Sequence, residues 1–189
     1  MKRWLFLLLL WQLWQPLTSL ANDRVLSQVM AALAAASSVE AAFREEKILA
    51  MLQEPLVTHG VLYYRAPSYL RKQTLEPQPE DFQADGDWLT IEMPGQGRRD
   101  FNLNGHPQLR AFVEAVRATQ GGDQAALEEH YRLEFTGDLA SWNLRLMPRD
   151  SQVAEYLTLI MVQGRGAWIE RIEMLETSGD RSVMTVTPR

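Results

Sequence analysis

The sequence predicts an α+β fold in which one large antiparallel sheet is covered by a few short helices. Short strand-like runs alternate with turn-forming Pro, Gly and Asp pairs over most of the chain, and they give about ten strands. Helical periodicity is confined to the N-terminal region, the middle and one short connection. No repeat or low-complexity linker divides the 189 residues, so we expect a single domain.

The first 21 residues have the pattern of a secretory signal peptide. Basic Lys2 and Arg3 precede an uninterrupted apolar run over residues 4–11, and the small residues Ser19 and Ala21 occupy the −3 and −1 positions of a cleavage site. An uncleaved membrane anchor is the weaker interpretation, because a spanning helix needs roughly 20 apolar residues. We therefore expect a cleaved signal peptide over residues 1–21 and one domain over residues 22–189.

The expected domain begins with a helix and continues with strands. Asn22 and Asp23 can cap the helix, which is predicted from apolar residues at helical spacing: Val25, Leu26, Val29, Met30 and Leu33. Residues 39–52 suit a helix as well as a strand, but the hairpins that follow directly favour a strand. Further strands are predicted over residues 57–65, 69–75, 88–93 and 99–103.

A helical segment interrupts the strands in the middle of the chain. Pro107 suits the first turn of a helix over residues 107–119, and we expect the helix to cover the sheet as a lid through the apolar stripe Leu109, Phe112, Val113 and Val116. Arg110, Glu114 and Arg117 are expected to stay in solvent.

The second half of the chain returns to strands. Asp123 can cap a second short helix, which is expected to end at about His130. Strands are then predicted over residues 132–136, 142–147, 158–163, 167–176 and 182–187, with one or two helical turns between residues 150 and 157.

The apolar face of this sheet leaves two interpretations open. A sheet of about ten strands curls, and two or three short helices are a small cover for its inner face. The interior is then either filled by side chains or left with a cavity. On composition, plain core filling is the simpler interpretation, although seven methionines after residue 21 favour an adaptable apolar interior.

Composition excludes several classes of function. A net charge of −5 argues against a general nucleic-acid binder, which carries a basic face. The absence of cysteine excludes disulfides, thiolate zinc sites, a cysteine nucleophile and a lipid-accepting cysteine. His59, His106 and His130 are too far apart in sequence for a local metal site. We therefore expect no metal and no cofactor.

No motif indicates an enzyme. The sequence lacks the G-x-S-x-G, H-E-x-x-H and S-x-x-K patterns of nucleophile and zinc hydrolases. Three carboxylate pairs are better explained as solvated charge than as catalytic acids: Glu45 with Glu46, Asp85 with Asp87, and Glu128 with Glu129. Binding is therefore a better prediction than catalysis, and a small lipid hydrolase is the least favoured hypothesis.

Two groups of residues resemble the LolA-like outer-membrane lipoprotein carrier family, in its divergent LolA-related branch. The first group extends over residues 43–70 and consists of Phe43, Glu45, Lys47, Leu49, Leu52, Pro55, Leu56, Gly60, Leu62, Tyr64, Pro67 and Leu70. The second group is spread over the later strands and turns: Asp85-Gly86-Asp87-x-Leu89, Gly122-Asp123, Trp142-x-Leu144-x-Leu146-x-Pro148 and Gly179-Asp180.

The resemblance implies a fold, a ligand and partners. It implies an unclosed antiparallel β-barrel covered by helices, with a hydrophobic cavity that shelters acyl chains. It also implies transport from an inner-membrane transporter to an outer-membrane receptor. The receptor relative of this fold is itself lipidated, so a chain without cysteine does not match it. The basic residue typical of the carrier's cavity has three candidate counterparts here, Arg44, Lys47 and Arg65.

We therefore expect a monomeric periplasmic carrier, not lipidated, that binds the acyl chains of lipoproteins or other lipids. The alternative is a periplasmic sensor of lipid or misassembled protein that has the same fold and regulates a membrane partner. Non-directional contacts with Leu and Met suit reversible binding of an acyl chain. The residues expected to line the cavity are Phe43, Leu62, Tyr64, Leu89, Ile91, Met93, Trp142, Leu144, Leu146, Ile172 and Met174.

Overall fold

The computed structural model describes residues 17–189, and most of the predicted signal peptide lies outside them. The strands are β1 (Ser38–Ile48), β2 (Leu56–Arg65), β3 (Tyr69–Glu76), β4 (Glu80–Asp85), β5 (Trp88–Met93), β6 (Gly97–Asn102), β7 (Tyr131–Asp138), β8 (Ser141–Pro148), β9 (Leu157–Arg165), β10 (Trp168–Glu176) and β11 (Arg181–Pro188). The helices are α1 (Leu17–Ala34), the 3-10 helix η1 (Leu103–Gly105), α2 (Pro107–Gln120), α3 (Gln124–His130) and α4 (Ser151–Ala154). No helix in this described part is long and apolar enough to cross a membrane.

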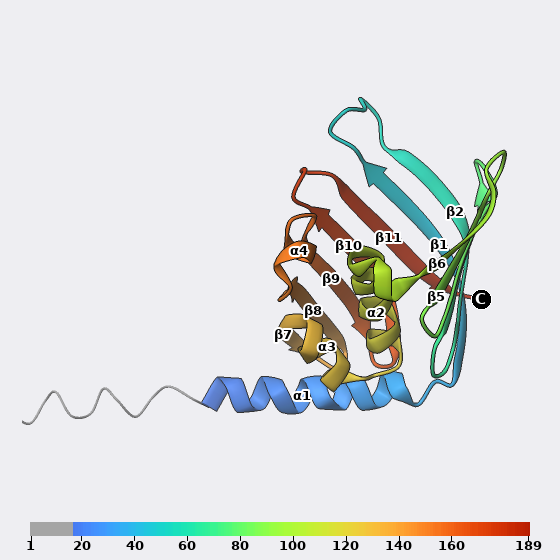
Figure 1. Ribbon diagram of the computed structural model, residues 1–189. Helices are drawn as coiled ribbons and strands as arrows, with labels where there is room; N and C mark the ends of the chain where they lie inside the picture. The colour runs from blue at the N-terminus through green and yellow to red at the C-terminus, as the bar shows by residue number, and fades with distance from the viewer. Residues whose placement is uncertain (1–16) are drawn as a thin grey trace, which may run out of the picture.

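The strands form one antiparallel sheet made of two meanders. β1 to β6 pair in sequence order, β7 to β11 do the same, and the pairing of β1 with β11 joins the two halves. β6 and β7 are the two edges, so the sheet curves without closing into a barrel (Figure 1). The segment between these edge strands carries η1, α2 and α3. The predicted fold class, an unclosed antiparallel sheet covered by a few helices, is confirmed.

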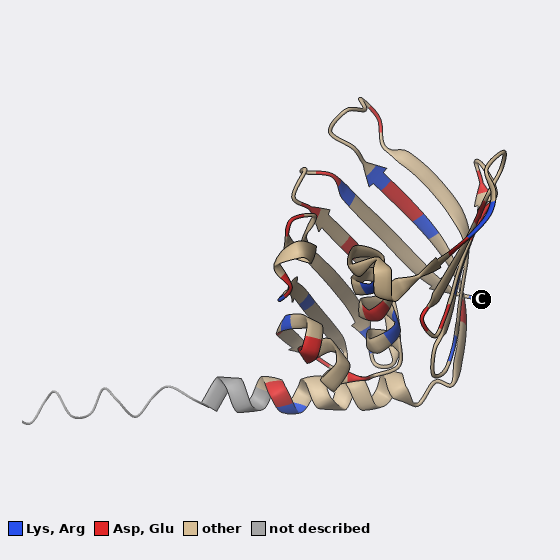
Figure 2. Ribbon diagram, in the orientation of Figure 1, with Lys and Arg blue, Asp and Glu red and all other residues tan. Residues whose placement is uncertain are grey.

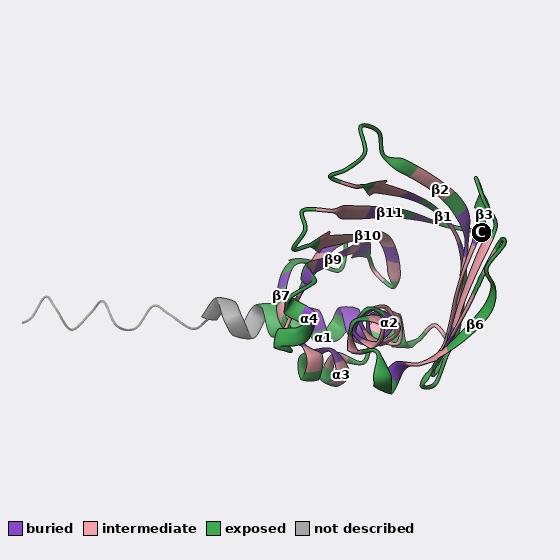
Figure 3. Cartoon of the chain, turned by 45° about the horizontal axis from the view of Figure 1, so that its top comes forward, coloured by how far each residue is buried: buried purple, intermediate pink, exposed green. Residues whose placement is uncertain are grey.

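The helices lie on the concave side of the sheet. In Figure 3, α2 lies inside the arch of strands, and α1, α3 and α4 lie near the β7 end. α2 packs against the other three helices, against η1 and against β3. α1 and α3 pack on β7, and α4 packs on β8 and β9. The central strands β1, β10 and β11 make no comparable contact with α2.

Buried apolar residues form three groups. The largest joins α1, α2, α3, α4 and strands β7 to β10, and it includes Leu144 and Leu146, whose side chains have no solvent exposure. A second group lies between α2 and the strands β4 and β5, and consists of Ala84, Leu89, Leu103 and Val113. The third group lies on the central strands and contains no helix residue: Ala41, Phe43, Met184 and Val186.

The first helix starts earlier than the sequence predicts. α1 begins at Leu17, so Asn22 and Asp23 lie inside it instead of capping it. The side-chain amide of Asn22 donates to the carbonyl oxygen of Phe135 on β7 at 3.4 Å. Residues 17–21 contain no Pro or Gly, so the helix can continue through them toward the N-terminus. The expected buried positions of the helix are correct, because Leu26, Val29, Met30 and Leu33 are buried.

One strand is missed by the sequence prediction. β4 (Glu80–Asp85) has acidic or amide side chains at four of its six positions, a composition depleted in strands. It forms because it pairs with β3 on one side and with β5 on the other. Only Phe82 and Ala84 alternate as apolar residues, and both face the helices. The ten other predicted strands are present, and residues 39–52 contain the strand β1.

Candidate functional site

The strand registers place all eleven predicted cavity residues on the concave side of the sheet. On the C-terminal half, Leu144 is opposite Val162 and Val162 is opposite Ile172. On the N-terminal half, Leu62 is opposite Lys72, which is opposite Phe82, which is opposite Ile91. Directly opposed residues share a face, and side chains alternate along each strand. The other predicted residues are therefore on the same, concave face.

These eleven residues differ in accessibility. Six are buried within the protein: Phe43, Tyr64, Leu89, Trp142, Leu144 and Leu146. The other five remain partly exposed to solvent, and we call them the concave apolar surface: Leu62, Ile91, Met93, Ile172 and Met174. Leu62 and Ile172 pack against the third buried group, which has no helix residue, and Ile172 and Met174 also pack against the largest group. The concave side is therefore solid core near α1 and accessible near its centre.

Helix α2 contributes a further accessible residue. Ala111, Ala115 and Ala118 pack in the largest buried group, whereas Leu109 and Val113 pack in the group with β4 and β5. Phe112 and Val116 of the predicted stripe lie between these two sides of the helix, given 100° of rotation per residue. Val116 is partly exposed, and Phe112 is 38% exposed. The predicted stripe therefore does not pack as one surface.

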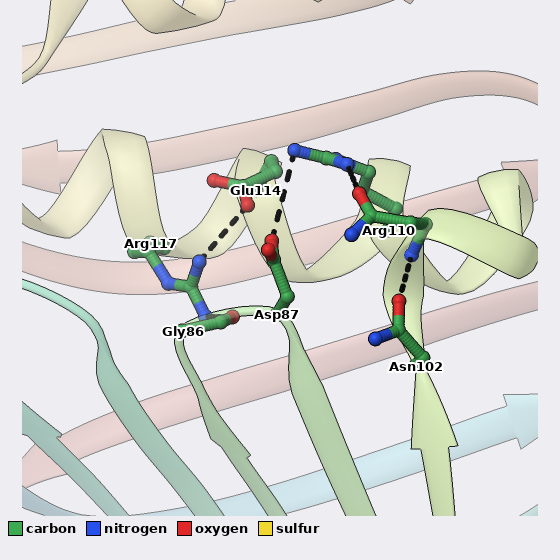
Figure 4. A network of polar contacts seen from close by, with 7 residues as sticks. Gly86, Asp87, Asn102, Arg110, Glu114 and Arg117 are labelled. Atoms are coloured by element: carbon green, nitrogen blue, oxygen red, sulfur yellow. Dashed lines mark hydrogen bonds and ion pairs between the residues drawn. The ribbon is translucent and has the colours of Figure 1, made fainter.

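Polar residues of α2 anchor the helix to the turn between β4 and β5. Arg117 binds Glu114 at 2.9 Å and donates to the carbonyl oxygen of Gly86 at 3.0 Å (Figure 4). Arg110 lies 3.9 Å from the carboxylate of Asp87. Glu114 and Arg117 are largely buried, so the expectation that both stay in solvent is wrong. The reason is that the β4–β5 turn supplies a carbonyl acceptor for Arg117.

A cluster of polar side chains lies on the concave side among the central strands. We call it the Glu45 cluster, and it consists of Glu45, Thr58, Lys72 and Ser182. Glu45 is only 5% exposed and forms an ion pair with Lys72. The hydroxyls of Ser182 and Thr58 donate to its carboxylate at 2.5 and 3.5 Å. Three neighbouring strands, β2, β3 and β11, thus supply the groups that satisfy one buried carboxylate on β1.

The Glu45 cluster rests on an aromatic ring. The Lys72 ammonium lies 5.1 Å from the ring centroid of Phe43, a cation–π distance. The Phe43 ring in turn covers Gly60, where an added Cβ would overlap the ring and the backbone of Gln73. Glycine at this position leaves the room that the ring occupies beside β2. The ion pair and the apolar residues are therefore parts of one packed surface.

Burial and pairing act in opposite directions on these two groups. Burial alone would raise the pKa of Glu45, but Lys72, Ser182 and Lys47 together hold the pKa below its ordinary value. For Lys72, desolvation outweighs the attraction of Glu45 and lowers its pKa. The cluster is thus an ion pair whose surroundings favour the charged form of the carboxylate.

The three basic residues that the sequence offers as candidates for the concave side do not include Lys72. Arg44 and Arg65 alternate with the concave positions and lie on the convex side, whereas Lys47 is on the concave side. The alternation of Phe43, Glu45 and Lys47 showed that charge shares a face with an aromatic residue. Lys72 becomes recognisable only when the β2–β3 register is known, because that register places it opposite Leu62.

Two open hollows of about 550 and 420 Å³ lie away from the concave apolar surface, near the β9–β10 turn. Gln163 lines both hollows and Arg171 lines the first, and these two residues directly oppose each other on the convex side. Among the described residues, no group of three or more His, Asp or Glu side chains could hold a metal ion.

A family model described as outer membrane lipoprotein carrier protein LolA-like matches residues 18–187. This chain belongs to that family. The LolA-like description is that of a carrier protein, and the match covers every strand of the chain except the last residue of β11. A search of curated proteins finds no match.

Solved structures with a similar arrangement share little sequence with this LolA-like chain. A LolA superfamily protein from Nitrosomonas europaea has 12% identity and a TM-score of 0.47, over 89% of this chain and 93% of that one. A putative outer membrane lipoprotein-sorting protein domain from Vibrio parahaemolyticus has 14% identity and a TM-score of 0.46, over 87% and 91%. The Pseudomonas aeruginosa MucA/MucB complex has 14% identity and a TM-score of 0.44, over 86% of this chain and 56% of that one.

The Glu45 cluster leads to a prediction about stability. Lys72→Met removes the ammonium and leaves Glu45 buried without its counter-ion, so we expect the free energy of unfolding to fall by about 3–5 kcal/mol. Denaturant unfolding of the purified protein measures this loss. Arg98→Gln is the control, because Arg98 pairs with Asp100 on the exposed surface, where such a pair contributes about 0–1 kcal/mol. Equal losses in the two variants would contradict the proposed role of the pair.

The same carboxylate predicts a pH dependence. The folded protein holds the pKa of Glu45 below its ordinary value of 4.5, so ionised Glu45 stabilises the fold above pH 4.5. That contribution is lost as the pH falls through the lowered pKa. We expect the difference in unfolding free energy between wild type and Glu45→Gln to shrink on acidification below pH 4.5. A difference that stays constant between pH 6 and 3 would show that Glu45 titrates normally.

Proposed function

We propose that this protein is a periplasmic carrier that binds lipid acyl chains on the concave apolar surface and moves them between the inner and outer membranes. The observation that carries the proposal is the accessibility of that surface. Ile172 and Met174 remain partly exposed on the helix-facing side of a sheet whose neighbouring positions, such as Leu144 and Val162, are buried. The family description, a lipoprotein carrier, agrees with an apolar ligand.

The physical basis of the proposal is the cost of exposing an acyl chain to water. Each CH₂ group that leaves water gains about 0.8 kcal/mol, so even partial coverage of a long chain gives useful affinity. Contacts with Ile172, Met174 and Phe112 are non-directional, and they can accept chains of different length or saturation. Incomplete coverage keeps the affinity low enough for release. A surface of this kind suits transfer better than permanent storage.

The location and partners are part of the same proposal. We propose that the signal peptide over residues 1–21 directs export and is removed, and that the protein acts as an unlipidated monomer. The cargo is the acyl portion of a lipoprotein or of another lipid. An inner-membrane transporter would load the protein and an outer-membrane receptor would accept the cargo.

Export predicts a defined N-terminus. We expect the mature protein to begin at Asn22, because Ser19 and Ala21 fit the −3 and −1 positions of a cleavage site. N-terminal sequencing of the protein from a periplasmic fraction measures this. Recovery of the protein from the inner membrane with residues 4–11 still attached would exclude free diffusion between the membranes.

Binding on the concave apolar surface predicts a difference between the two sides of β10. Ile172→Glu places a carboxylate where the acyl chain would lie, so binding of a fluorescent fatty acid should fall at least about tenfold. Leu175→Glu is the matched control, since Leu175 is on the same strand, is also partly exposed, and lies on the convex side. This control should bind like the wild type. Fluorescence titration measures affinity, and a denaturant melt verifies folding.

Transfer of the bound fluorescent fatty acid to vesicles distinguishes a carrier from a sensor. The loaded wild-type protein is mixed with lipid vesicles that lack the probe, and the probe's emission reports its arrival in the vesicles. A carrier releases the probe to the vesicles, whereas a sensor retains it. Wild-type protein that binds no fatty acid after solvent extraction, or equal loss of binding in Ile172→Glu and Leu175→Glu, would contradict the proposed site.

A further inference from the structure

Charged residues are unevenly distributed over the concave side of the sheet. The helix-facing positions of β7, β8, β9 and β11 carry no charged residue. The helix-facing positions of the N-terminal meander, by contrast, include Glu45, Lys47, Lys72, Glu80 and Arg99. In Figure 2, charge is concentrated in the C-terminal half of β1. An amphiphile bound on this side would therefore meet an uncharged half and a charged half.

Lys72 and Lys47 are the two cations whose charges act on Glu45. Lys47 is two residues from Glu45 on the same face of β1, and both Glu45 and Lys72 experience its charge. Lys47 is partly exposed and has no ion pair or hydrogen bond with any side chain in the described part of the protein. Lys72 donates a hydrogen bond to Glu45. Because an ammonium has three N–H groups, the Lys72 ammonium can still donate to a further acceptor.

Glu45 does not neutralise both lysines. Its carboxylate already accepts from Lys72, Ser182 and Thr58, and it is nearly inaccessible to solvent. The remaining positive charge therefore belongs to Lys47 and to the unused side of Lys72. A partly desolvated ammonium is stabilised by an anion more strongly than one in bulk water.

The lysines also adjoin the concave apolar surface. Leu62 is directly opposite Lys72 on the neighbouring strand, and the Phe43 ring lies beneath the ammonium. Ile172 and Leu62 flank the same buried group as Phe43. An apolar chain lying along Leu62 and Ile172 would therefore end beside the two ammonium groups.

We propose that Lys47 and Lys72 form a head-group subsite for an amphiphile that carries one anionic group, a carboxylate or a phosphate, at the end of its apolar chain. The subsite rests on the proposed function, because it assumes that the chain lies on the concave apolar surface. Glu45 holds Lys72 in place when the subsite is empty. An uncharged amphiphile binds through its chain alone, so the subsite selects among lipids that share the same chain.

A displacement experiment tests the subsite. Lauric acid, dodecyl phosphate and dodecanol, which have the same number of carbon atoms, are tested for displacement of an uncharged fluorescent apolar probe from the full mature protein. Charge-assisted hydrogen bonds contribute about 1.5–3 kcal/mol, so the two anionic compounds should bind about 10- to 100-fold more tightly than dodecanol. Lys47→Gln should reduce that preference about tenfold, and Lys47→Glu should abolish it.

Lys47 is the better site for substitution because it has no structural partner to lose, whereas Lys72 holds a buried carboxylate. Arg44→Gln is the matched control, since Arg44 is also on β1 but faces the convex side, where it pairs with Glu46. This control should keep the full preference for the anionic compounds. Dodecanol should bind equally to the wild type, Lys47→Gln and Arg44→Gln.

The outcomes separate the subsite from the proposed function. Equal binding of all three compounds to the wild type, or an unchanged preference in Lys47→Gln, would overturn the subsite and leave acyl binding intact. Failure of all three compounds to displace the probe would overturn the proposed function itself. Millimolar inorganic phosphate is included in a parallel series. If it removes the preference for dodecyl phosphate, the lysines bind free phosphate and the head-group assignment is wrong.

Discussion

An open sheet of eleven strands has a larger apolar face than its few helices can cover, and this imbalance determines most of the structure. Closing the sheet into a barrel would allow its own side chains to fill the interior. Here β6 and β7 remain edges, because the chain between them forms η1, α2 and α3 and crosses the concave side. The helices must therefore cover the face, and they do so fully only near β7, β8 and β9.

The consequence is a division of the concave side into two environments. Near α1, side chains such as Leu144 and Leu146 have no solvent exposure and behave as ordinary core. Near the central strands, Leu62, Ile172 and Met174 stay partly accessible, because α2 packs on the other helices and on β3 and makes no comparable contact with β1, β10 or β11. The contacts of Arg117 and Arg110 with the β4–β5 turn hold α2 in this position. The same helix thus completes one core and leaves the neighbouring surface accessible.

The sequence predicts the elements and the faces well, because both depend on local pattern. Alternation along β5, β8 and β10 correctly places Ile91, Leu144 and Ile172 on one side of the sheet. The pattern cannot separate Leu144 from Ile172, since their exposure depends on where α2 lies, and that is set by long-range packing. β4 was missed for a similar reason, because its acidic residues form a strand only between two strong neighbours. The partnership of Lys72 with Glu45 joins residues that are 27 positions apart in sequence, so it required the observed register.

The Glu45 cluster explains how an accessible apolar surface can carry charge at its centre. A lone carboxylate at 5% exposure would be costly, and the ion pair with Lys72 and two hydroxyls offsets that cost. Replacing the pair with apolar residues could be neutral or favourable for stability, so stability alone does not account for it. A fully apolar open face would also attract any hydrophobic surface, including a second copy of the protein. Charge within the face opposes such contacts, since they would desolvate Lys47 and Lys72 without providing an anion. An amphiphile with an anionic end provides that anion, so the same residues that weaken unspecific association would favour a particular class of ligand.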